Sequence, residues 1–453
     1  MALVLSQANA QAPGHRLVSP VSSTDTLLFD DQGVLVHTWP SQHKPGMAAY
    51  VRANGNLLRS IVTAEGPSGV GGGIQECTID GQLVWDYRLD SDELLAHHDI
   101  EPLPNGNVLA VAWESLSRDA ALAAGRDPKR LRELTRPDRI VEVRPTGRTS
   151  GEIVWSWRAL DQAEIDINYP PERTSGELHH INGIDYDATY DWIVVAACFQ
   201  DELWVIDKSS GQLVFRFGNP AAAGRATENE RALFFPHAPR FVPQEEGPPH
   251  LLVFNNRAKP RSEVLEITLP TGKTTWSYSG EGFDSDYMAS AERLPGGNTL
   301  VCSSMQLRVF EVDPAGDIVW EIGMEELASF PFHATYVERT LWADRPRRSI
   351  SATESGRDVV SFHVIAGSRH AGEITLLYEG DAAPRWPWGW PWGDSLLGGG
   401  LLDTRGKARL AIRARCPTRL EWLGIRRSFS YRSLAAGKIT PNAANRVELV
   451  VTP

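Results

Sequence analysis

The sequence predicts an all-β protein: a six-bladed β-propeller followed by a small C-terminal β-sandwich-like domain. Three observations predict it: a repeated hairpin with an aromatic residue at a fixed place, a second type of hairpin upstream of most copies, and the end of the repeat near residue 350. Repeats of roughly 40 to 50 residues that each contain four short strands are typical of propeller blades. We therefore expect residues 1–345 to form the propeller and residues 350–453 to form the second domain.

The first type of hairpin consists of two alternating apolar runs joined by an acidic or polar turn that contains glycine. Asp and Gly between two such runs favour a tight β-turn. Four residues after the shared glycine most copies carry Trp or Phe, and the first copy carries His37 with Trp39 close by. The copies are residues 27–39, 77–87, 140–157, 203–217, 264–278 and 309–322.

A second type of hairpin lies upstream of most of these copies. Its clearest examples are "YVRANGNLLRSIV", "IEPLPNGNVLAVAW" and "AERLPGGNTLVCSS". Two hairpins together make one four-stranded blade. The copy at 27–39 has no such partner upstream, and "FHATYVERTLW" at 332–342 has none downstream. Pairing these two with each other closes a ring of six blades and removes free sheet edges.

Two segments depart from the repeat. Residues 117–138, "SRDAALAAGRDPKRLRELTRPD", are rich in alanine and in charge, so we expect a helical insertion within one blade. After the repeat ends, "VVSFHVIAGSRHAGEITLLY", "KARLAIRAR" and "NRVELVV" alternate as strands do, which predicts the C-terminal β-sandwich-like domain.

Composition and charge exclude several classes of protein. A net charge of -12 argues against nucleic-acid binding, because such proteins present a basic surface. No stretch approaches the length of apolar sequence that spans a bilayer, so we expect no membrane span. The N-terminal stretch "MALVLSQANAQAPGH" has no basic region and only a short apolar run, so we expect no signal peptide in this chain. The oligomeric state is left open.

Histidines stand at equivalent places in four of the repeats. The innermost strand of each propeller blade lines the central channel, and the strand before each Asn-Gly-type turn is expected to be the innermost one. A single histidine at the start of such a strand is usually structural, but four at equivalent places predict a functional cluster at one mouth of the channel. The four are His98, His180, His237 and His333.

Other residues are expected beside this cluster. His97 and His179 precede two of the four histidines, so strand alternation should turn them away from the axis unless a bulge intervenes. Arg257 ends the strand that returns from His237 and should reach the same mouth, where a guanidinium can hold an oxyanion. The candidate substrate-binding residues are Tyr287, Asn182 and Asn256.

Around these residues the sequence resembles the PAPS-independent arylsulfotransferases, propeller enzymes that move sulfuryl groups between phenols. The resemblance covers most of residues 90–325 and implies a transiently sulfated histidine, further histidines and an arginine that hold the sulfate, and no soluble sulfate donor cofactor. It also implies a small aromatic substrate and a periplasmic or extracellular location. The matching stretches are "HHDIEPLPNGNVLAVAWE", "LHHINGIDYDATYDWIVVAACFQDELWVID", "FRFGNP", "LFFPHAPRFVP", "LLVFNNR" and "AERLPGGNTLVCSSMQLRVFEVDPAGDIVWE".

Matched residue by residue, His180 and His237 look like the family's sulfate-site histidines, and Arg257 looks like its arginine. His98 belongs to the matching "HHD" stretch. The fifth inner strand, "FDSDYMASAERLPGG", contains a tyrosine but no histidine, so His333 remains as a candidate for the sulfated residue. In such chemistry a neutral imidazole attacks sulfur and forms a covalent intermediate, while cationic groups position the loose transition state.

Two other functions fit the same residues. The four histidines, with Asp99 and Asp185 nearby and Glu177 behind them, could hold a divalent metal ion for a lyase, hydrolase or oxygenase. The propeller could also bind a ligand without catalysis, because one fold hosts many functions. In the metal interpretation the ligands are His98, His180, His237 and His333.

Overall fold

The structure is a computed structural model. It describes residues 11–131, 134–169, 176–224, 230–323, 327 and 329–338, and after these only the backbone of nine further strands. The chain divides into two compact units. One contains Met1–Gly33 and Thr38–Val337, and the other contains Val34–His37 and Glu338–Pro453.

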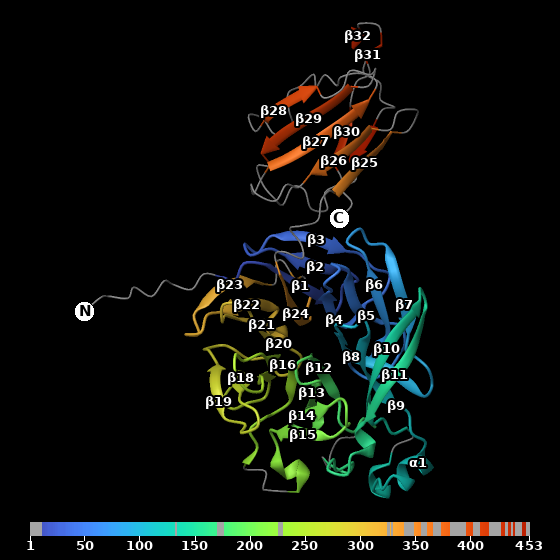
Figure 1. Ribbon diagram of the computed structural model, residues 1–453, viewed down its shortest axis with the longest axis vertical. Coiled ribbons are helices and arrows are strands. Elements are labelled where there is room, and N and C mark those ends of the chain that lie inside the picture. Colours follow the sequence, from blue (N-terminus) through green and yellow to red (C-terminus); the bar gives the residue numbers. More distant parts are fainter. Residues whose placement is uncertain are drawn as a thin grey trace, which may run out of the picture. The chain divides into compact units, whose positions relative to one another are not determined.

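Six four-stranded antiparallel sheets surround a common axis, so the predicted six-bladed propeller is confirmed (Figure 1). Five blades take their strands in chain order. These strands are β4 (Pro45–Val51), β5 (Leu57–Val62), β6 (Gly72–Cys77) and β7 (Leu83–Arg88); β8 (Leu94–Pro102), β9 (Val108–Glu114), β10 (Asp138–Gly147) and β11 (Ser150–Arg158); β12 (Ile181–Asp187), β13 (Trp192–Ala197), β14 (Glu202–Asp207) and β15 (Leu213–Phe217); β16 (Pro236–Val242), β17 (His250–Asn255), β18 (Glu263–Ile267) and β19 (Thr274–Tyr278); and β20 (Ser290–Arg293), β21 (Thr299–Ser303), β22 (Arg308–Val312) and β23 (Ile318–Ile322).

The sixth blade joins the two ends of the repeat. Its order is β24 (Pro331–Val337), β1 (His15–Pro20), β2 (Thr26–Phe29) and β3 (Leu35–Trp39). The predicted closure of the first copy on the last is therefore present, with β1 as an additional strand between them. β1 runs antiparallel to β24, with Leu17 opposite Thr335, and its buried Arg16 forms an ion pair with Glu311 of β22. The ring thus leaves no open edge between its first and last blades.

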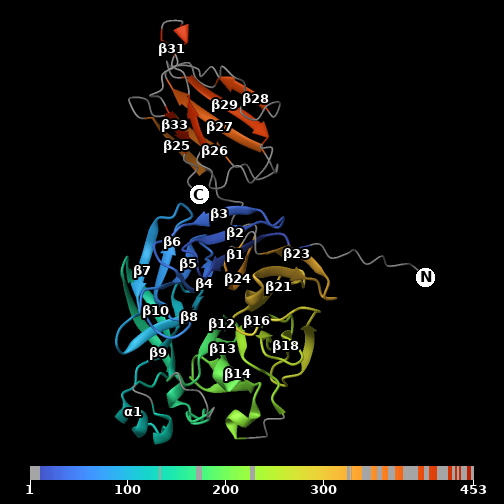
Figure 2. The same cartoon turned by 180° about the vertical axis from the view of Figure 1, so that it is seen from behind.

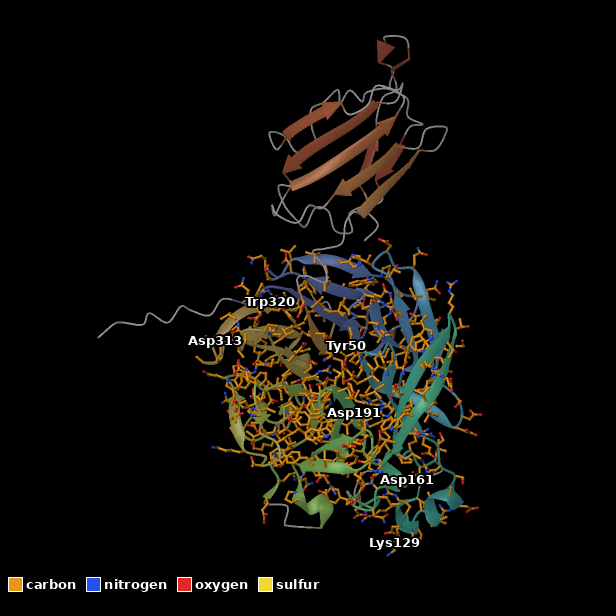
Figure 3. All side chains as sticks on the ribbon, in the orientation of Figure 1. Tyr50, Lys129, Asp161, Asp191, Asp313 and Trp320 are labelled. Atoms are coloured by element: carbon orange, nitrogen blue, oxygen red, sulfur yellow. The ribbon has the colours of Figure 1, made fainter. Side chains whose placement is uncertain are left out.

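The innermost strands are β4, β8, β12, β16, β20 and β24, which pack side by side around the axis (Figures 1 and 2). Most of them are the strands that precede the Asn-Gly-type turns, as predicted. Figure 3 shows Tyr50 of β4 near the middle of the propeller, whereas Lys129 and Asp161 lie at its rim. The inner strands therefore surround the axial region.

Four of the repeated tryptophans connect one blade to the next. The indole Nε1–H of Trp85 donates to the carbonyl of Ser150, at 3.1 Å, in the outer turn of the following blade. Trp155, Trp276 and, in the first copy, Trp39 make the equivalent bond to Lys208, Pro314 and Thr78. Buried indoles need a partner for their N–H group. The repeat therefore encodes the spacing between blades as well as the hairpins.

The predicted insertion connects β9 and β10 and contains the helix α1 (Arg118–Ala123), which Ser117 caps at its N-terminus. The insertion was expected to extend to Asp138, but β10 begins at that residue. None of the helices in the described part of the chain has the length and apolar character needed to cross a bilayer. Short 3-10 helices are found at Pro128–Arg130, Ala159–Asp161, Cys198–Gln200, Pro220–Ala223 and Ser304–Gln306.

The second unit contains a seven-stranded sheet in the order β28-β29-β27-β26-β25-β33-β30 and a separate pair, β31-β32. The segments between these strands lie outside the described residues, so the β-sandwich-like architecture remains a prediction. The strands are β25 (Arg348–Glu354), β26 (Val360–Ile365), β27 (Glu373–Gly380), β28 (Leu396–Leu401), β29 (Ala408–Arg415), β30 (Arg427–Ser430), β31 (Leu434–Ala435), β32 (Lys438–Ile439) and β33 (Arg446–Leu449).

Candidate active site at the propeller axis

The backbone is irregular where the inner strands carry histidine pairs. The pairing register of β8 with β9 shifts around His98, and that of β12 with β13 shifts just after His180. Both histidines have positive φ, 50° at His98 and 53° at His180. Left-handed backbone is uncommon for residues other than glycine, and such conformations concentrate at functional sites. The same irregularity in two blades gives the second histidine of each pair an equivalent place.

Three histidines from three different blades meet at the axis. The imidazole rings of His98 and His180 are 4.6 Å apart between centroids and nearly perpendicular. The ring of Phe332 on β24 lies 5.8 Å from that of His98 and 6.0 Å from that of His237. All three histidines are buried, and His180 is the most accessible of them at 8% exposure.

His98 contacts the first histidine of its own pair. The Nδ1 atoms of His98 and His97 are 2.8 Å apart, and Nε2 of His97 lies 3.1 Å from Oδ1 of Asp138. Burial lowers the pKa of His98 well below its ordinary value, and the neighbouring His180 lowers it further. Burial also lowers the pKa of His97, although Asp138 opposes this. Both rings are therefore neutral near pH 7.

Asp138, the first residue of β10, holds both histidine pairs. Its Oδ2 lies 3.2 Å from Nδ1 of His179 and accepts the backbone N–H of His180 at 3.0 Å, while its Oδ1 accepts that of Ile181 at 3.1 Å. Burial by itself would raise the pKa of this carboxyl, but the contacts with His179 and His97 outweigh burial and leave the pKa below its ordinary value. Asp138 is thus a fully buried, ionised carboxylate between two blades.

His180 has a carboxylate partner of its own. Its Nδ1 lies 2.6 Å from Oε1 of Glu177, and its ring stacks on Phe199 with 4.4 Å between centroids. Within the described residues, no group hydrogen-bonds to Nε2 of His180 or to Nε2 of His98. Nε2 of His97 and Nε2 of His179 also have no hydrogen-bond partner in the described part of the chain, but both of those atoms are fully buried, which leaves Nε2 of His98 and Nε2 of His180 as the candidates to meet a substrate.

The glycine-rich loop "GPSGVGGG", residues 66–73, packs against His98. A Cβ on Gly69 would lie 2.0 Å from Cε1 and 2.1 Å from Nε2 of His98, and the φ of Gly69 is +87°. Only glycine fits a position with both constraints. The carbonyl of Gly69 also accepts the backbone N–H of His98 at 2.8 Å. This loop, which carried no functional signal in the sequence, fixes the place of the His98 ring.

His237 uses both of its ring nitrogens within the protein. Its Nδ1 lies 2.8 Å from Oδ1 of Asn256, and its Nε2 accepts the backbone N–H of Met288 at 3.2 Å. Burial lowers the pKa of His237 to about 3, so the ring is neutral. Asn256 is itself fully buried and donates to the carbonyls of Ser285 and Met288. Asn256 therefore orients His237 from behind.

Arg257 and Tyr287 form an exposed edge beside the cluster. Arg257 follows β17, whose last residue pairs with the start of β16, and its guanidinium carbon lies 3.8 Å from the centroid of the Phe235 ring. Its Nε donates to the carbonyl of Asp286 at 3.1 Å. Tyr287, which follows Asp286 in the chain, is 44% exposed. The remaining candidate, Asn182, is fully buried and donates to the carbonyl of Pro236.

A second polar cluster lies further along the same inner strands. Arg240 of β16 donates to the hydroxyl of Tyr50 at 2.7 Å, to Nε2 of His333 at 2.8 Å and to Glu101 at 3.2 Å. It also contacts Asp185 at 3.4 Å. A side chain that reaches inner strands of four other blades must lie at the axis. His333 thus belongs to this Arg240 network, while the neighbouring Phe332 faces His98 and His237.

Carboxyl groups dominate the Arg240 network. Burial raises the pKa of Glu101 well above its ordinary value and raises that of Asp185, although Arg240 opposes both shifts. Burial likewise raises the pKa of Asp99, which accepts a hydrogen bond from the Tyr50 hydroxyl at 2.9 Å.

Among the described residues, no set of three or more His, Cys, Asp or Glu side chains is arranged to hold a metal ion.

Several residues of the site had no signal in the sequence. Asp138 lies on the third strand of its blade, 41 residues from His179, at the end of the predicted helical insertion. Arg240 lies in the stretch "HAPRFVP", where no pattern in the sequence predicts a role for it. The aromatic residues could have been found from their places next to histidines or to the exposed arginine: Phe199, Phe235 and Phe332.

Comparisons with solved structures find matches of low sequence identity. A protein of unknown function from Bacteroides caccae shares 15% identity over 72% of this chain and 99% of its own, with a TM-score of 0.49. Virginiamycin B lyase from Staphylococcus aureus shares 12% identity over 70% of this chain and 82% of its own, with a TM-score of 0.39. Similarity at this level carries no argument about activity. No curated protein matches the chain.

The family comparison is more informative. The model of the arylsulfotransferase (ASST) family matches residues 6–316. This range includes both histidine pairs, the glycine-rich loop, His237 and Arg257. It extends over well more than half of the chain and ends at the turn before β23. The chain belongs to the arylsulfotransferase family.

Proposed function

We propose that this protein transfers a sulfuryl group between phenolic compounds at the cluster of His98, His180 and His237. The observation that carries the proposal is the pair of free Nε2 atoms, on His98 and His180, whose rings are 4.6 Å apart. Double displacement through a covalent intermediate needs one nucleophile and one proton carrier within reach of the same sulfur. Two neighbouring imidazoles with unused nitrogens supply both.

The edge of the site offers complementary groups for an aryl sulfate. The guanidinium of Arg257 is exposed and can hold the oxygens of a sulfate ester, because its fork of N–H donors matches a tetrahedral oxyanion. The exposed Tyr287 and the ring of Phe332 can pack against an aromatic ring. Cation and aromatic surface together favour a small anionic aryl ester over an uncharged ligand.

The reaction is proposed to need neither a metal ion nor a soluble sulfate donor. Support comes from the family and from the organisation of the histidines, whose Nδ1 atoms each contact protein groups that fix the ring. An aryl sulfate itself would then be the donor and a phenol the acceptor.

The test uses the full chain with 4-nitrophenyl sulfate as donor and phenol as acceptor. We expect release of nitrophenol that depends on phenol, equals the phenyl sulfate formed and persists in the presence of a chelator. His180→Gln and His237→Gln should abolish the transfer. Glu142→Gln is the matched control, because Glu142 lies on β10 but binds Asn105, Asn107 and Lys208 away from the cluster.

Two results would overturn the proposal. One is an absence of transfer by folded protein with a range of aryl sulfates and phenols. The other is activity that a chelator removes and an added divalent ion restores, which would point to the metal enzyme instead. Binding of aryl sulfates without turnover would indicate the ligand-binding propeller.

A further inference from the structure

We infer that His98 is the nucleophile of this site and that His97, held by Asp138, sets the tautomer that makes it one. This inference rests on the proposed sulfuryl transfer and goes beyond it by assigning roles to His98 and His97. His97 is a positioning residue, because it contacts His98 and not the substrate.

The hydrogen positions follow from one carboxylate. Asp138 is ionised and its Oδ1 lies 3.1 Å from Nε2 of His97; the two atoms form no aligned hydrogen bond, but the nearby negative charge favours a proton on this nitrogen over a lone pair. The neutral His97 ring then has its lone pair on Nδ1, which can only accept from Nδ1 of His98 at 2.8 Å. The proton of the neutral His98 ring is therefore on Nδ1. Its lone pair is on Nε2, the nitrogen that has no hydrogen-bond partner in the described residues.

The second pair is organised differently although it shares the same carboxylate. His179 also contacts Asp138, at 3.2 Å, but it makes no contact with the ring of His180. The ring of His180 is fixed by Glu177 at 2.6 Å instead. A carboxylate directly on Nδ1 holds a proton there and leaves Nε2 of His180 to take up or release a second one. His180 is thus suited to be the proton carrier, and His98 to be the nucleophile.

The two other histidines that the repeat superposes, His237 and His333, use both of their ring nitrogens within the protein. Both ring nitrogens of His237 have partners, Asn256 and the backbone N–H of Met288. Nε2 of His333 accepts from Arg240, and its Nδ1 lies 3.5 Å from the Thr335 hydroxyl. A nucleophile at either position would have to break these bonds first.

The proposed step balances in both halves. The lone pair of His98 Nε2 forms a bond to sulfur while the bond from sulfur to the phenolic oxygen breaks. The departing oxygen keeps that electron pair and takes the proton from Nε2 of His180. The positive charge left on the sulfated His98 ring is stabilised through its Nδ1–H, by His97 and Asp138 in turn. The acceptor phenol then returns a proton to His180, its oxygen bonds to sulfur, and the electron pair of the N–S bond returns to His98.

The intermediate gives the first test. The full chain is incubated with 4-nitrophenyl sulfate and no acceptor, digested at alkaline pH, and searched by mass spectrometry for a peptide carrying one SO3 group. We expect the modification on His98, and none in His98→Gln. Modification of His180 or His333 would overturn the assignment.

The role of His97 is tested by a matched pair of variants. His97→Phe and His179→Phe each replace a buried imidazole in contact with Asp138 by a ring of similar size, but only His97 contacts the ring of a second histidine. We expect kcat to fall about a hundredfold in His97→Phe and at most a few-fold in His179→Phe, with KM little changed in both. Equal losses in the two variants would mean that the pairs only stabilise the fold.

A spectroscopic measurement keeps the failure of this inference separate from failure of the proposed function. Nitrogen NMR of protein labelled with 15N-histidine reports which ring nitrogen carries the proton, and His98→Gln identifies the signal. We expect His98 to be protonated on Nδ1 in the native protein and to become a mixture of tautomers in His97→Phe. A His98 protonated on Nε2 would overturn the inference even if the protein transfers sulfuryl groups. If His98 is protonated on Nδ1 but the folded protein transfers no sulfuryl group, the proposed function and the role of His98 as nucleophile are both wrong. Only the contact between His97 and His98 would then stand.

Discussion

The propeller axis holds two buried polar clusters, and they differ in what their side chains leave unused. In the histidine cluster, Nε2 of His98 and Nε2 of His180 have no hydrogen-bond partner among the described residues and, unlike Nε2 of His97 and His179, are not fully buried. The Arg240 network further along the same strands connects Tyr50, Glu101 and His333 through bonds that use their polar atoms on one another.

This difference separates a reactive site from a structural one. Both clusters contain histidines with lowered pKa values, and the four histidines that the repeat superposes are divided between them, three in the first cluster and His333 in the Arg240 network. Clustering and perturbed pKa values therefore do not by themselves identify the site, since structural networks show them as well. What distinguishes the candidate active site is a ring nitrogen without a hydrogen-bond partner in the described residues, close to an exposed cation, Arg257.

The largest expected effect is a loss of transfer rate when a histidine of the histidine cluster is replaced. His180→Gln should lower the rate of transfer from 4-nitrophenyl sulfate by about 10³-fold to 10⁴-fold, because it removes the proton carrier. His333→Gln should lower the melting temperature and leave most of the rate in the folded protein, because His333 is bonded to Arg240. Rates and thermal unfolding of both variants are measured side by side. The reverse pattern would place the chemistry in the Arg240 network.

Loss of the central cation should be the largest effect on stability. Arg240→Leu leaves Glu101 and Asp185 without their buried partner, which costs about 3 to 5 kcal/mol in comparable cases. Arg144→Leu is the control, since its ion pair with Glu152 is more than half exposed and contributes about 0 to 1 kcal/mol. Denaturant unfolding of the two variants gives the difference. Similar losses of unfolding free energy in the two variants would mean that Arg240 contributes no more to stability than an exposed ion pair does.

The link between the two histidine pairs should have an intermediate effect. Asp138→Asn places an amide N–H₂ against backbone N–H groups and imidazoles that now donate to the carboxylate, so we expect a loss of kcat of about a hundredfold together with some loss of stability. Glu142→Gln on the same strand should leave kcat unchanged. An Asp138→Asn enzyme of normal activity and stability would show that the carboxylate orients nothing.

The smallest expected effect concerns the pH dependence of stability. Burial raises the pKa of Glu292 on β20 from 4.5 to about 7. Between these values the folded protein binds more protons than the unfolded chain, so stability falls as the pH rises through this window. Glu292→Gln should therefore be more stable than the native protein well above pH 7, by about 3 kcal/mol, and similar to it below pH 4.5. A constant difference across this range would contradict the shift.

The amount of the site that could be predicted depended on whether a residue belongs to the repeat. His98, His180 and His237 were predicted to meet because the repeat superposes them, and the structure places them together. His333 was predicted beside them for the same reason, yet it lies in the Arg240 network, since Phe332 takes the place toward the histidines. A pattern of period two cannot tell which of two adjacent residues faces the axis once the strand carries a bulge.

The sequence by itself determined the six-bladed propeller, its closure and its family, because turn chemistry, strand alternation and the aromatic slot are local and recur in each blade. It also determined that histidines stand at equivalent positions. Only the tertiary structure decided how they are connected. Asp138 reaches two blades, Gly69 packs against His98 from a neighbouring blade, and Arg240 bonds across the axis. These contacts join residues far apart in the chain that share no periodic pattern, so they exist only once the ring has closed.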